Sequence, residues 1–312
     1  MSKIIIRWLL TALPVLFGVS VITFVLSSLV PGNAARAILG INATQEQVDA
    51  LNTELGFDEP LPVRYWTWLT GALHGDLGVS VVNGLPVTEQ IGARIGITAS
   101  LIVGAVIVAA VLGVAFGVTS ALRGGWLGKA VDVVALIGMA IPGFWFALVL
   151  VTVFAVQLRW FPATGYIMPS ESVTGWLQSL VLPLLALGIP SAAPVAKQTR
   201  DGMLTEMGKD YIKVLRARGV RERSVIFRHA LRNAASPVLT VLGIVAVVLL
   251  GGTVLAETVF VIPGLGGLAV NATSSHDIPT IQGLAVVFTM IVMVVNLAIE
   301  LTYALVNPKA RA

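Results

Sequence analysis

The sequence predicts an all-α integral membrane protein with six transmembrane helices and an extended external segment between the first two. Of its 312 residues 56% are hydrophobic and 12% are charged, whereas soluble domains carry roughly 25% charged residues. Six apolar stretches are long enough to cross a bilayer, and most basic residues lie between them. Each span must be helical, because lipid satisfies no exposed backbone group.

The first apolar stretch runs from Trp8 to Val30 and follows the basic residues Lys3 and Arg7. This start is typical of a signal peptide, and Ala35-Arg36-Ala37 offers a cleavage-like triplet. The stretch is longer than the roughly 7 to 15 apolar residues of a cleaved signal. We therefore expect residues 1–30 to form the cytoplasmic N-terminus and an uncleaved first span.

Residues 31–94 form the extended external segment, which is acidic. Thr44 and Gln47 have the spacing of a capping box, so we expect a short amphipathic helix that Gly56 ends. The aromatic run Tyr65-Trp66-Thr67-Trp68 is suited to the membrane boundary. A plainer alternative is that these rings only anchor an outer helix.

The remaining five spans belong to a core transmembrane domain of residues 95–306. We expect them at residues 95–122, 131–158, 176–195, 237–260 and 281–306, followed by a cytoplasmic C-terminal tail, residues 307–312. With the N-terminus in the cytoplasm, sixteen of the twenty Lys and Arg residues lie inside and four outside. This split follows the positive-inside rule and places both termini on the cytoplasmic side of the inner cell membrane.

The inner loop at residues 197–236 is too polar to span and too patterned to be a plain linker. Apolar residues at Tyr211, Val214 and Leu215 alternate with basic ones, which predicts a short helix with one basic face. Gly219 follows at a position where a turn is needed. We expect a helix, a turn and a second helix beneath the bilayer. The alternative from pattern alone is a basic loop held against anionic lipid.

This loop also carries a recognisable motif. It reads Asp210-Tyr211-Ile212-Lys213, then Arg216-Ala217-Arg218-Gly219, then His229-Ala230-Leu231-Arg232-Asn233-Ala234. The run resembles the cytoplasmic signature of binding-protein-dependent ABC permeases of the dipeptide, oligopeptide and nickel family. Lys213-Val214-Leu215 stands where the superfamily commonly has Glu-Ala-Ala.

Other segments resemble the same family along nearly the whole chain. They are Pro31-Gly32, His74-Gly75-Asp76-Leu77-Gly78, Glu257-Thr258-Val259-Phe260, Pro263-Gly264-Leu265-Gly266 and Val306-Asn307-Pro308. A departure is Asn33-Ala34, where the family commonly has Asp-Pro. The resemblance implies the fold of a type I ABC importer permease.

The resemblance also implies two sets of functional residues. The first is an ATPase-coupling loop, in which Val214, Leu215 and Val220 enter a groove on the ATPase and flanking arginines meet acidic rims. Its members are Asp210, Tyr211, Val214, Leu215, Arg216, Ala217, Gly219, Val220, His229 and Asn233. The second is an outer gate at Glu257, Pro263, Gly264 and Gly266. A plainer role for Glu257 is to brace the loop.

The partners that the resemblance implies are a second, paralogous permease, two cytoplasmic ABC ATPase subunits and an external solute-binding protein. ATP and Mg²⁺ are then used by the ATPases, and this chain binds no cofactor and no nucleic acid. The implied cargo is a di- or oligopeptide, with nickel chelates and glutathione as the competing cargoes.

Catalytic chemistry is not expected in this chain. The stretch Gly124 to Ala130 is similar to a phosphate-binding loop, but its glycine spacing is one residue short and Ala130 replaces the required hydroxyl. The three histidines fall in different loops and there is no cysteine, so we expect no metal site. Two alternatives of another class are a membrane scaffold and an ion-coupled transporter with Glu300 as proton carrier. The latter predicts inverted repeats, and none is evident.

Overall fold

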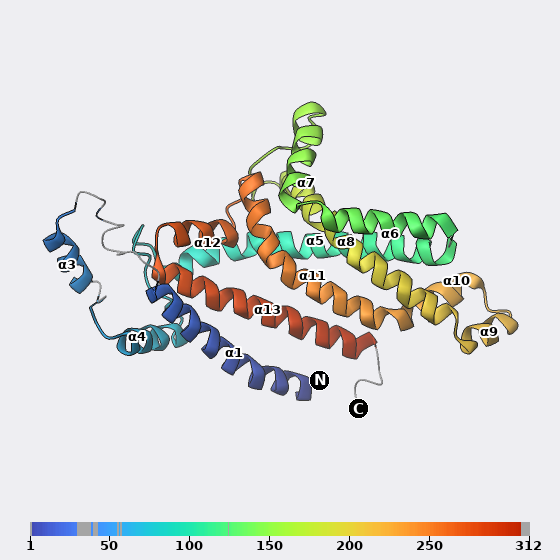
Figure 1. Cartoon of the computed structure of the whole chain (residues 1–312), viewed down its shortest axis with the longest axis horizontal. Coiled ribbons are helices and arrows are strands. Elements are labelled where there is room, and N and C mark those ends of the chain that lie inside the picture. Colours follow the sequence, from blue (N-terminus) through green and yellow to red (C-terminus); the bar gives the residue numbers. More distant parts are fainter. Residues whose placement is uncertain are drawn as a thin grey trace. The chain divides into compact units, whose positions relative to one another are not determined.

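The computed structural model describes residues 2–29, 39, 43–54, 56, 58–123 and 125–306, and most of them are helical (Figure 1). The helices are α1 (Ser2–Leu29), α3 (Gln45–Glu54), α4 (Leu61–Leu73), α5 (Val87–Arg123), α6 (Gly125–Ala140), α7 (Gly143–Leu150), the π-helix η1 (Val151–Gln157), α8 (Val173–Met207), α9 (Asp210–Ala217), α10 (Glu222–Ser224), the π-helix η2 (Val225–Ala230), α11 (Leu231–Phe260), α12 (Leu265–Ser274) and α13 (Ile278–Val306). The all-α prediction is confirmed. The motifs at residues 31–34 and 307–308, the triplet at 35–37 and the tail at 307–312 lie outside the described residues.

Within the described part of the chain, five helical stretches are long and apolar enough to cross a membrane. They are Ile4–Leu29, Val87–Arg123, Val173–Met207, Glu222–Phe260 and Ile278–Thr302. These correspond to five of the six predicted spans, and the agreement confirms a multi-pass membrane protein.

The predicted span at residues 131–158 is not one continuous helix. α6 ends at Ala140, and α7 begins after Pro142 and continues into η1 (Figure 1). Proline lacks a backbone N–H and disfavours a helical conformation in the residue before it, here Ile141. The apolar run therefore continues through Pro142, but the helix does not.

Two spans are longer than predicted at the ends that face the inner loop. α8 continues past residue 195 to Met207, and α11 begins at Leu231 instead of residue 237. The polar side chains of these extra turns favour a loop in a prediction from sequence. In the structure the apolar helices continue through these residues, and this pairs their backbone N–H and C=O groups. The connection between the spanning stretches Val173–Met207 and Glu222–Phe260 is therefore confined to residues 208–221.

The chain divides into two compact units. The first contains residues 1–5, 99–262 and 295–312, and the second contains residues 6–98 and 263–294. In the first unit α8 is the central helix, because α6, α7 and α11 all pack against it. Its core consists of Ala105, Ala109, Val195, Val238, Val245 and Leu249.

Glycines allow α5 and α8 to approach closely inside this first unit. A Cβ atom added at Gly117 lies 2.6 Å from the carbonyl oxygen of Ala196, and one added at Gly113 lies 2.6 Å from Cβ of Val195. Small residues four positions apart are a common device for close helix packing in membranes. This contact fixes the position of α8, from which the inner loop continues.

In the second unit α4 packs against α1. Tyr65 of α4 shares a 2.8 Å hydrogen bond with the Ser20 hydroxyl of α1, and its ring packs edge-on against Phe24 with centroids 5.4 Å apart. Trp66 is 64% exposed. One ring of the aromatic run therefore anchors the outer helix, as in the plainer reading, while the next ring remains available to a membrane boundary.

The predicted start of α3 is confirmed in detail. The Thr44 backbone N–H donates to Oε1 of Gln47 at 3.0 Å, and the Gln47 N–H donates to Oγ1 of Thr44 at 3.3 Å. These reciprocal bonds are the capping box that the spacing predicts. Gly56, at φ +68°, follows the helix where its end is expected.

Candidate partner-docking site

The inner loop folds as a helix, a turn and a second helical segment. α9 follows α8 after a bend at residues 208–209, and α10 with η2 leads into α11 (Figure 1). Glycine at 219 separates the two segments at φ +75°. The sequence-based expectation for this loop is met by the structure.

A hydrogen-bonded turn ends α9 at Gly219. The N–H of Gly219 donates to the carbonyl oxygen of Arg216 at 2.9 Å, and the N–H of Val220 donates to that of Leu215 at 3.1 Å. This pair of bonds defines a Schellman motif, which needs a left-handed residue at the position of Gly219. A Cβ atom at Gly219 has no neighbour within 4 Å, so the requirement for glycine is conformational and not steric.

An ion pair bridges the turn from its outside. Arg216 donates from Nε to Oε2 of Glu222 at 3.1 Å and from Nη2 to Oε1 at 2.6 Å. These hydrogen bonds lower the pKa of the Glu222 carboxyl and raise that of the Arg216 guanidinium. The two-pronged geometry fixes the angle at which α9 meets α10.

One face of α9 packs on the protein itself. Ile212 is fully buried among Met203 of α8, Val118 of α5 and Ala234 of α11. Leu215 and Val220 are partly buried against the same cluster. α9 is therefore fastened to three membrane helices through apolar contacts.

The opposite face of α9 is open. Val214 is 51% exposed, and Ala217 beside it is exposed as well. Basic side chains surround them, namely Lys213, Arg216, Arg218, Arg221 and Arg223, all exposed. Of the three residues predicted to enter a partner's groove, Val214 is exposed, whereas Leu215 and Val220 pack against the chain's own core. We refer to Val214, Ala217 and these basic residues as the basic face.

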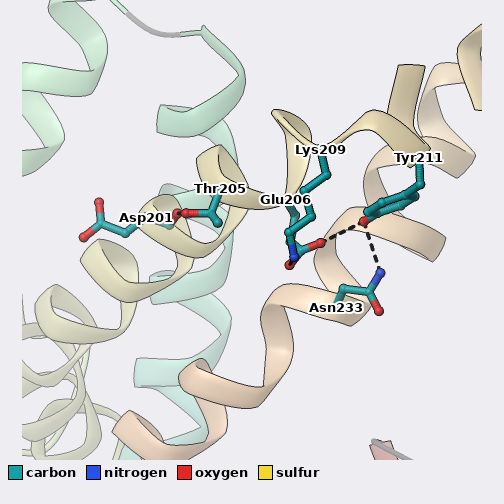
Figure 2. A network of polar contacts seen from close by, with 6 residues as sticks. All are labelled: Asp201, Thr205, Glu206, Lys209, Tyr211 and Asn233. Atoms are coloured by element: carbon teal, nitrogen blue, oxygen red, sulfur yellow. Dashed lines mark hydrogen bonds and ion pairs between the residues drawn. The ribbon is translucent and has the colours of Figure 1, made fainter. Parts of the chain in front are cut away.

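A polar network lies behind the basic face (Figure 2). The Tyr211 hydroxyl donates to Oε2 of Glu206 at 2.9 Å and accepts from Nδ2 of Asn233 at 3.1 Å. Nζ of Lys209 donates to Oε1 of Glu206 at 2.5 Å. The network joins the last turn of α8, the first turn of α9 and the first turn of α11.

The electrostatics of this network keep its protons in place. Burial raises the pKa of the Tyr211 phenol, so the hydroxyl remains a donor at neutral pH. The hydrogen bond to Glu206 raises the pKa of the Lys209 ammonium. Glu206 itself is only 8% exposed and accepts from both. Thr205, also in Figure 2, donates to the carbonyl oxygen of Asp201 at 2.9 Å, a bond internal to α8.

The remaining predicted residues of the loop occupy less central positions. Asp210 begins α9 and pairs with Lys213 at 2.8 Å, with both side chains largely exposed. His229 lies half-buried on η2. Glu206 is not among the predicted residues although it is the hub of the network. Its partner Tyr211 is among the predicted residues, and so is Asn233, which donates to Tyr211. An acidic residue closing an apolar helix is the only local signal for Glu206.

The predicted outer-gate residues fall in both units of the chain. Glu257, on α11 in the first unit, is 2% exposed. Its carbonyl oxygen accepts from the N–H of Ile262 at 2.8 Å across Val261, which adopts a left-handed φ of 52°. Pro263, Gly264 and Gly266 belong to the second unit, where Gly264 precedes α12 at an ordinary φ of −98°. The helix end therefore depends on a left-handed valine and not on the glycines.

Two polar residues on α13 are exposed along the membrane-spanning stretch. Asn296 and Glu300 lie four residues apart, so they share one helix face. Among the described residues no three His, Cys, Asp or Glu side chains gather in a group able to hold a metal ion. Residues 125–130, the described part of the phosphate-loop-like stretch, form the first turns of α6.

The arrangement is that of a membrane-spanning subunit with an external segment, five long spans and a short, rigidly held helix with a basic face. Comparison with known proteins agrees. Residues 109–312 match the model of the binding-protein-dependent transport system inner membrane component, and residues 1–102 match the model of the N-terminal part of such membrane components. The chain belongs to this family of transport permeases.

Its relatives extend over the whole chain. It is 38% identical to the probable peptide ABC transporter permease y4tP of Sinorhizobium fredii over 100% of both chains. It is also 38% identical to a putative peptide transport system permease of Brucella abortus, over 100% of this chain and 99% of the relative. The glutathione transport system permease GsiC of Pectobacterium atrosepticum is 37% identical, again over 100% and 99%.

These findings confirm the family resemblance and the reading of the chain as the permease subunit of an ABC transport system. Such a system depends on a binding protein, and the chain is its inner-membrane transport component. The ion-coupled transporter and the scaffold are disfavoured by this membership.

Proposed function

We propose that this chain is half of the passage of an ATP-driven importer for di- or oligopeptides, with a second, paralogous permease as the other half. Two cytoplasmic ATPase subunits bind and hydrolyse ATP with Mg²⁺, and an external binding protein delivers the cargo. Peptides are favoured because relatives named as peptide permeases are 38% identical over the full length. Glutathione, itself a small peptide, is the nearest alternative because of GsiC, and nickel chelates come next.

The observation that supports coupling to an ATPase is the basic face of α9. A short helix whose back is buried in a core shared with α5, α8 and α11 transmits force to those helices as a solid element. Its front presents Val214 and a set of arginines. In the described part of the chain Arg218, Arg221 and Arg223 form no ion pair. The partner surface is therefore an apolar depression with an acidic rim.

Orientation follows from the same charges. The basic face and the turn between α5 and α6, with Arg123 and Lys129, lie on the cytoplasmic side, together with both termini. The membrane core comprises residues 95–306, and residues 31–94 face the binding protein. Glu257, Pro263, Gly264 and Gly266 lie at the outer end of the passage in this arrangement.

Cysteine cross-linking tests the docking directly, because the natural chain contains no cysteine. A Val214→Cys variant, 51% exposed at wild type, is combined in turn with single cysteines along the candidate groove of the ATPase. We expect a specific disulfide between the two chains. The control is Trp160→Cys, which is also exposed, at 63%, but lies in the loop after η1. Cross-linking of Trp160→Cys but not of Val214→Cys to the ATPase contradicts the proposal.

A further inference from the structure

We propose that the hydrogen-bonded side chains of Glu206, Tyr211 and Asn233 transmit the motion of α9 to α8 and α11, with Glu206 as the positioning residue. We call these three side chains the latch. This inference rests on the proposed function, because it assigns to the network the transfer of motion between the ATPase and the membrane helices. It goes beyond docking, since none of the three side chains belongs to the basic face.

The first step is the distinction between two attachments of α9. The apolar attachment through Ile212 is close-packed but non-directional, so it holds α9 against the core without orienting a particular pair of atoms. The polar attachment is directional, because Tyr211 holds Glu206 at 2.9 Å and Asn233 at 3.1 Å. These polar contacts add a defined orientation to the attachment that the buried face of α9 provides.

The second step is that the latch spans both flanking helices. Glu206 lies on α8, and Asn233 lies on α11, 22 residues after Tyr211. One phenol hydroxyl thus connects the two helices that enter and leave the loop. α8 and α11 also pack against each other over their length. Any displacement of α9 is therefore imposed on this pair together and not on one member.

The third step concerns the acceptor. A carboxylate that is 8% exposed needs partners, and the donors that serve it are Tyr211 and Lys209. Both donors belong to the α9 side of the bend at residues 208–209. When α9 moves away from α8, the carboxylate loses both at once. The buried charge consequently resists separation of α9 from α8 more than a neutral side chain does.

The test uses the assembled complex in lipid nanodiscs, with both permeases, the ATPases and the binding protein as purified. ATP hydrolysis is measured with and without the binding protein in Tyr211→Phe, which removes one hydroxyl, and in Glu206→Gln, which keeps the size. We expect binding-protein stimulation to fall by roughly fivefold or more, within the range of coupling between two sites. Basal hydrolysis and the amount of assembled complex stay as in the parent.

A matched control variant and a double-mutant cycle distinguish the latch from a purely structural role. Tyr166→Phe also removes a tyrosine hydroxyl, one that accepts from Nε1 of Trp176 at 3.0 Å in the loop before α8. We expect its stimulation to be unchanged. The double variant Tyr211→Phe/Glu206→Gln is expected to lose less than the sum of the two single variants, because the bond between Tyr211 and Glu206 is altered in both.

The possible outcomes separate the latch from the proposed function. The proposed function is overturned if the parent complex shows no stimulation and the Val214→Cys variant forms no cross-link to the ATPase. The latch alone is overturned if the parent is stimulated and Val214→Cys forms the cross-link, but Tyr211→Phe and Glu206→Gln are stimulated as strongly as the parent. If Tyr211→Phe and Glu206→Gln lose assembled complex or basal hydrolysis in the same proportion as they lose stimulation, the two residues act in folding. This result also overturns the latch.

Discussion

The close approach of α5 to α8 makes Gly117 a position in the first unit at which an added side chain meets the backbone of a neighbouring helix. We predict that Gly117→Ala destabilises the protein, although alanine is the better helix former. A Cβ atom there lies 2.6 Å from the carbonyl oxygen of Ala196 and 2.5 Å from Cβ of Thr199. Both distances are well below ordinary contact, which begins at 3.4 Å. Backbone cannot rotate away as a flexible side chain does, so the two helices must separate by several tenths of an ångström.

The magnitude follows from two opposing terms. Overpacking of this kind costs about 1–3 kcal/mol, while replacing a helix-interior glycine with alanine gains about 0.5–1 kcal/mol. The net loss is about 1–2 kcal/mol, because the widened seam also weakens the contacts beside it. Gly96, on the same helix, has no atom within 4 Å of an added Cβ. Gly96→Ala therefore retains only the gain in helix propensity.

The assay is thermal unfolding of the purified protein in detergent, followed by the fluorescence of its seven tryptophans. We expect Gly117→Ala to melt several degrees below the parent and Gly96→Ala to melt at or above it. Equal melting temperatures for the two variants refute the close contact between α5 and α8.

Three further predictions concern single sites. Gly219→Ala destabilises the turn by about 1–2 kcal/mol in the left-handed position at φ +75°, whereas Gly219→Asn costs less. Amide hydrogen exchange of residues 210–222 distinguishes the two variants, and equal protection of these amides in both contradicts the turn. Asp277→Ala destabilises the protein by about 2–4 kcal/mol, because the buried carboxylate accepts from Oγ of Ser80 at 2.5 Å and Oγ1 of Thr280 at 2.7 Å. The rate of proteolysis within residues 74–86 reports this loss, and unchanged resistance to the protease counts against these bonds. Because Arg216 lowers the pKa of Glu222 below its ordinary 4.5, the pair's contribution is complete above that value and is lost as the pH falls through the lower folded one; exchange at residues 218–222 follows this course, and Glu222→Gln removes the pH dependence.

Local signals in the sequence predict those parts of the fold that depend on neighbouring residues. The capping box at Thr44 and Gln47 needs only a spacing of three, and the turn at Gly219 needs only one permissive residue between two patterned segments. Pro142 is an equally local signal, but the apolar run around it outweighs the proline in a prediction based on hydropathy. The break between α6 and α7 was missed for that reason.

Burial in the docking site was harder to predict. α9 is eight residues long, so apolar side chains at 211, 212, 214 and 215 fit more than one choice of inner face. The structure selects Ile212 as the buried residue, since Met203 and Val118 meet it there, and this leaves Val214 outside. No periodicity within α9 contains that information.

Glu206 illustrates what the sequence does not reveal. It closes α8, where an acidic side chain is ordinarily solvated, and its significance depends on Asn233 reaching the same tyrosine from another helix. Such a network exists only once α8 and α11 are packed side by side. The end of α11 was equally hidden, because its left-handed residue is Val261 and not a glycine.

The central claim is that this chain works as one permease within an ATP-driven complex that a binding protein supplies. The most direct measurement is to tag the chain, extract it gently from its native membrane and identify every co-purifying protein and retained small molecule by mass spectrometry. We expect a second permease, ABC ATPase subunits and a binding protein loaded with peptide. Recovery of the chain alone or as a homo-oligomer, without an ATPase and under conditions that keep other ABC transporters intact, contradicts the claim.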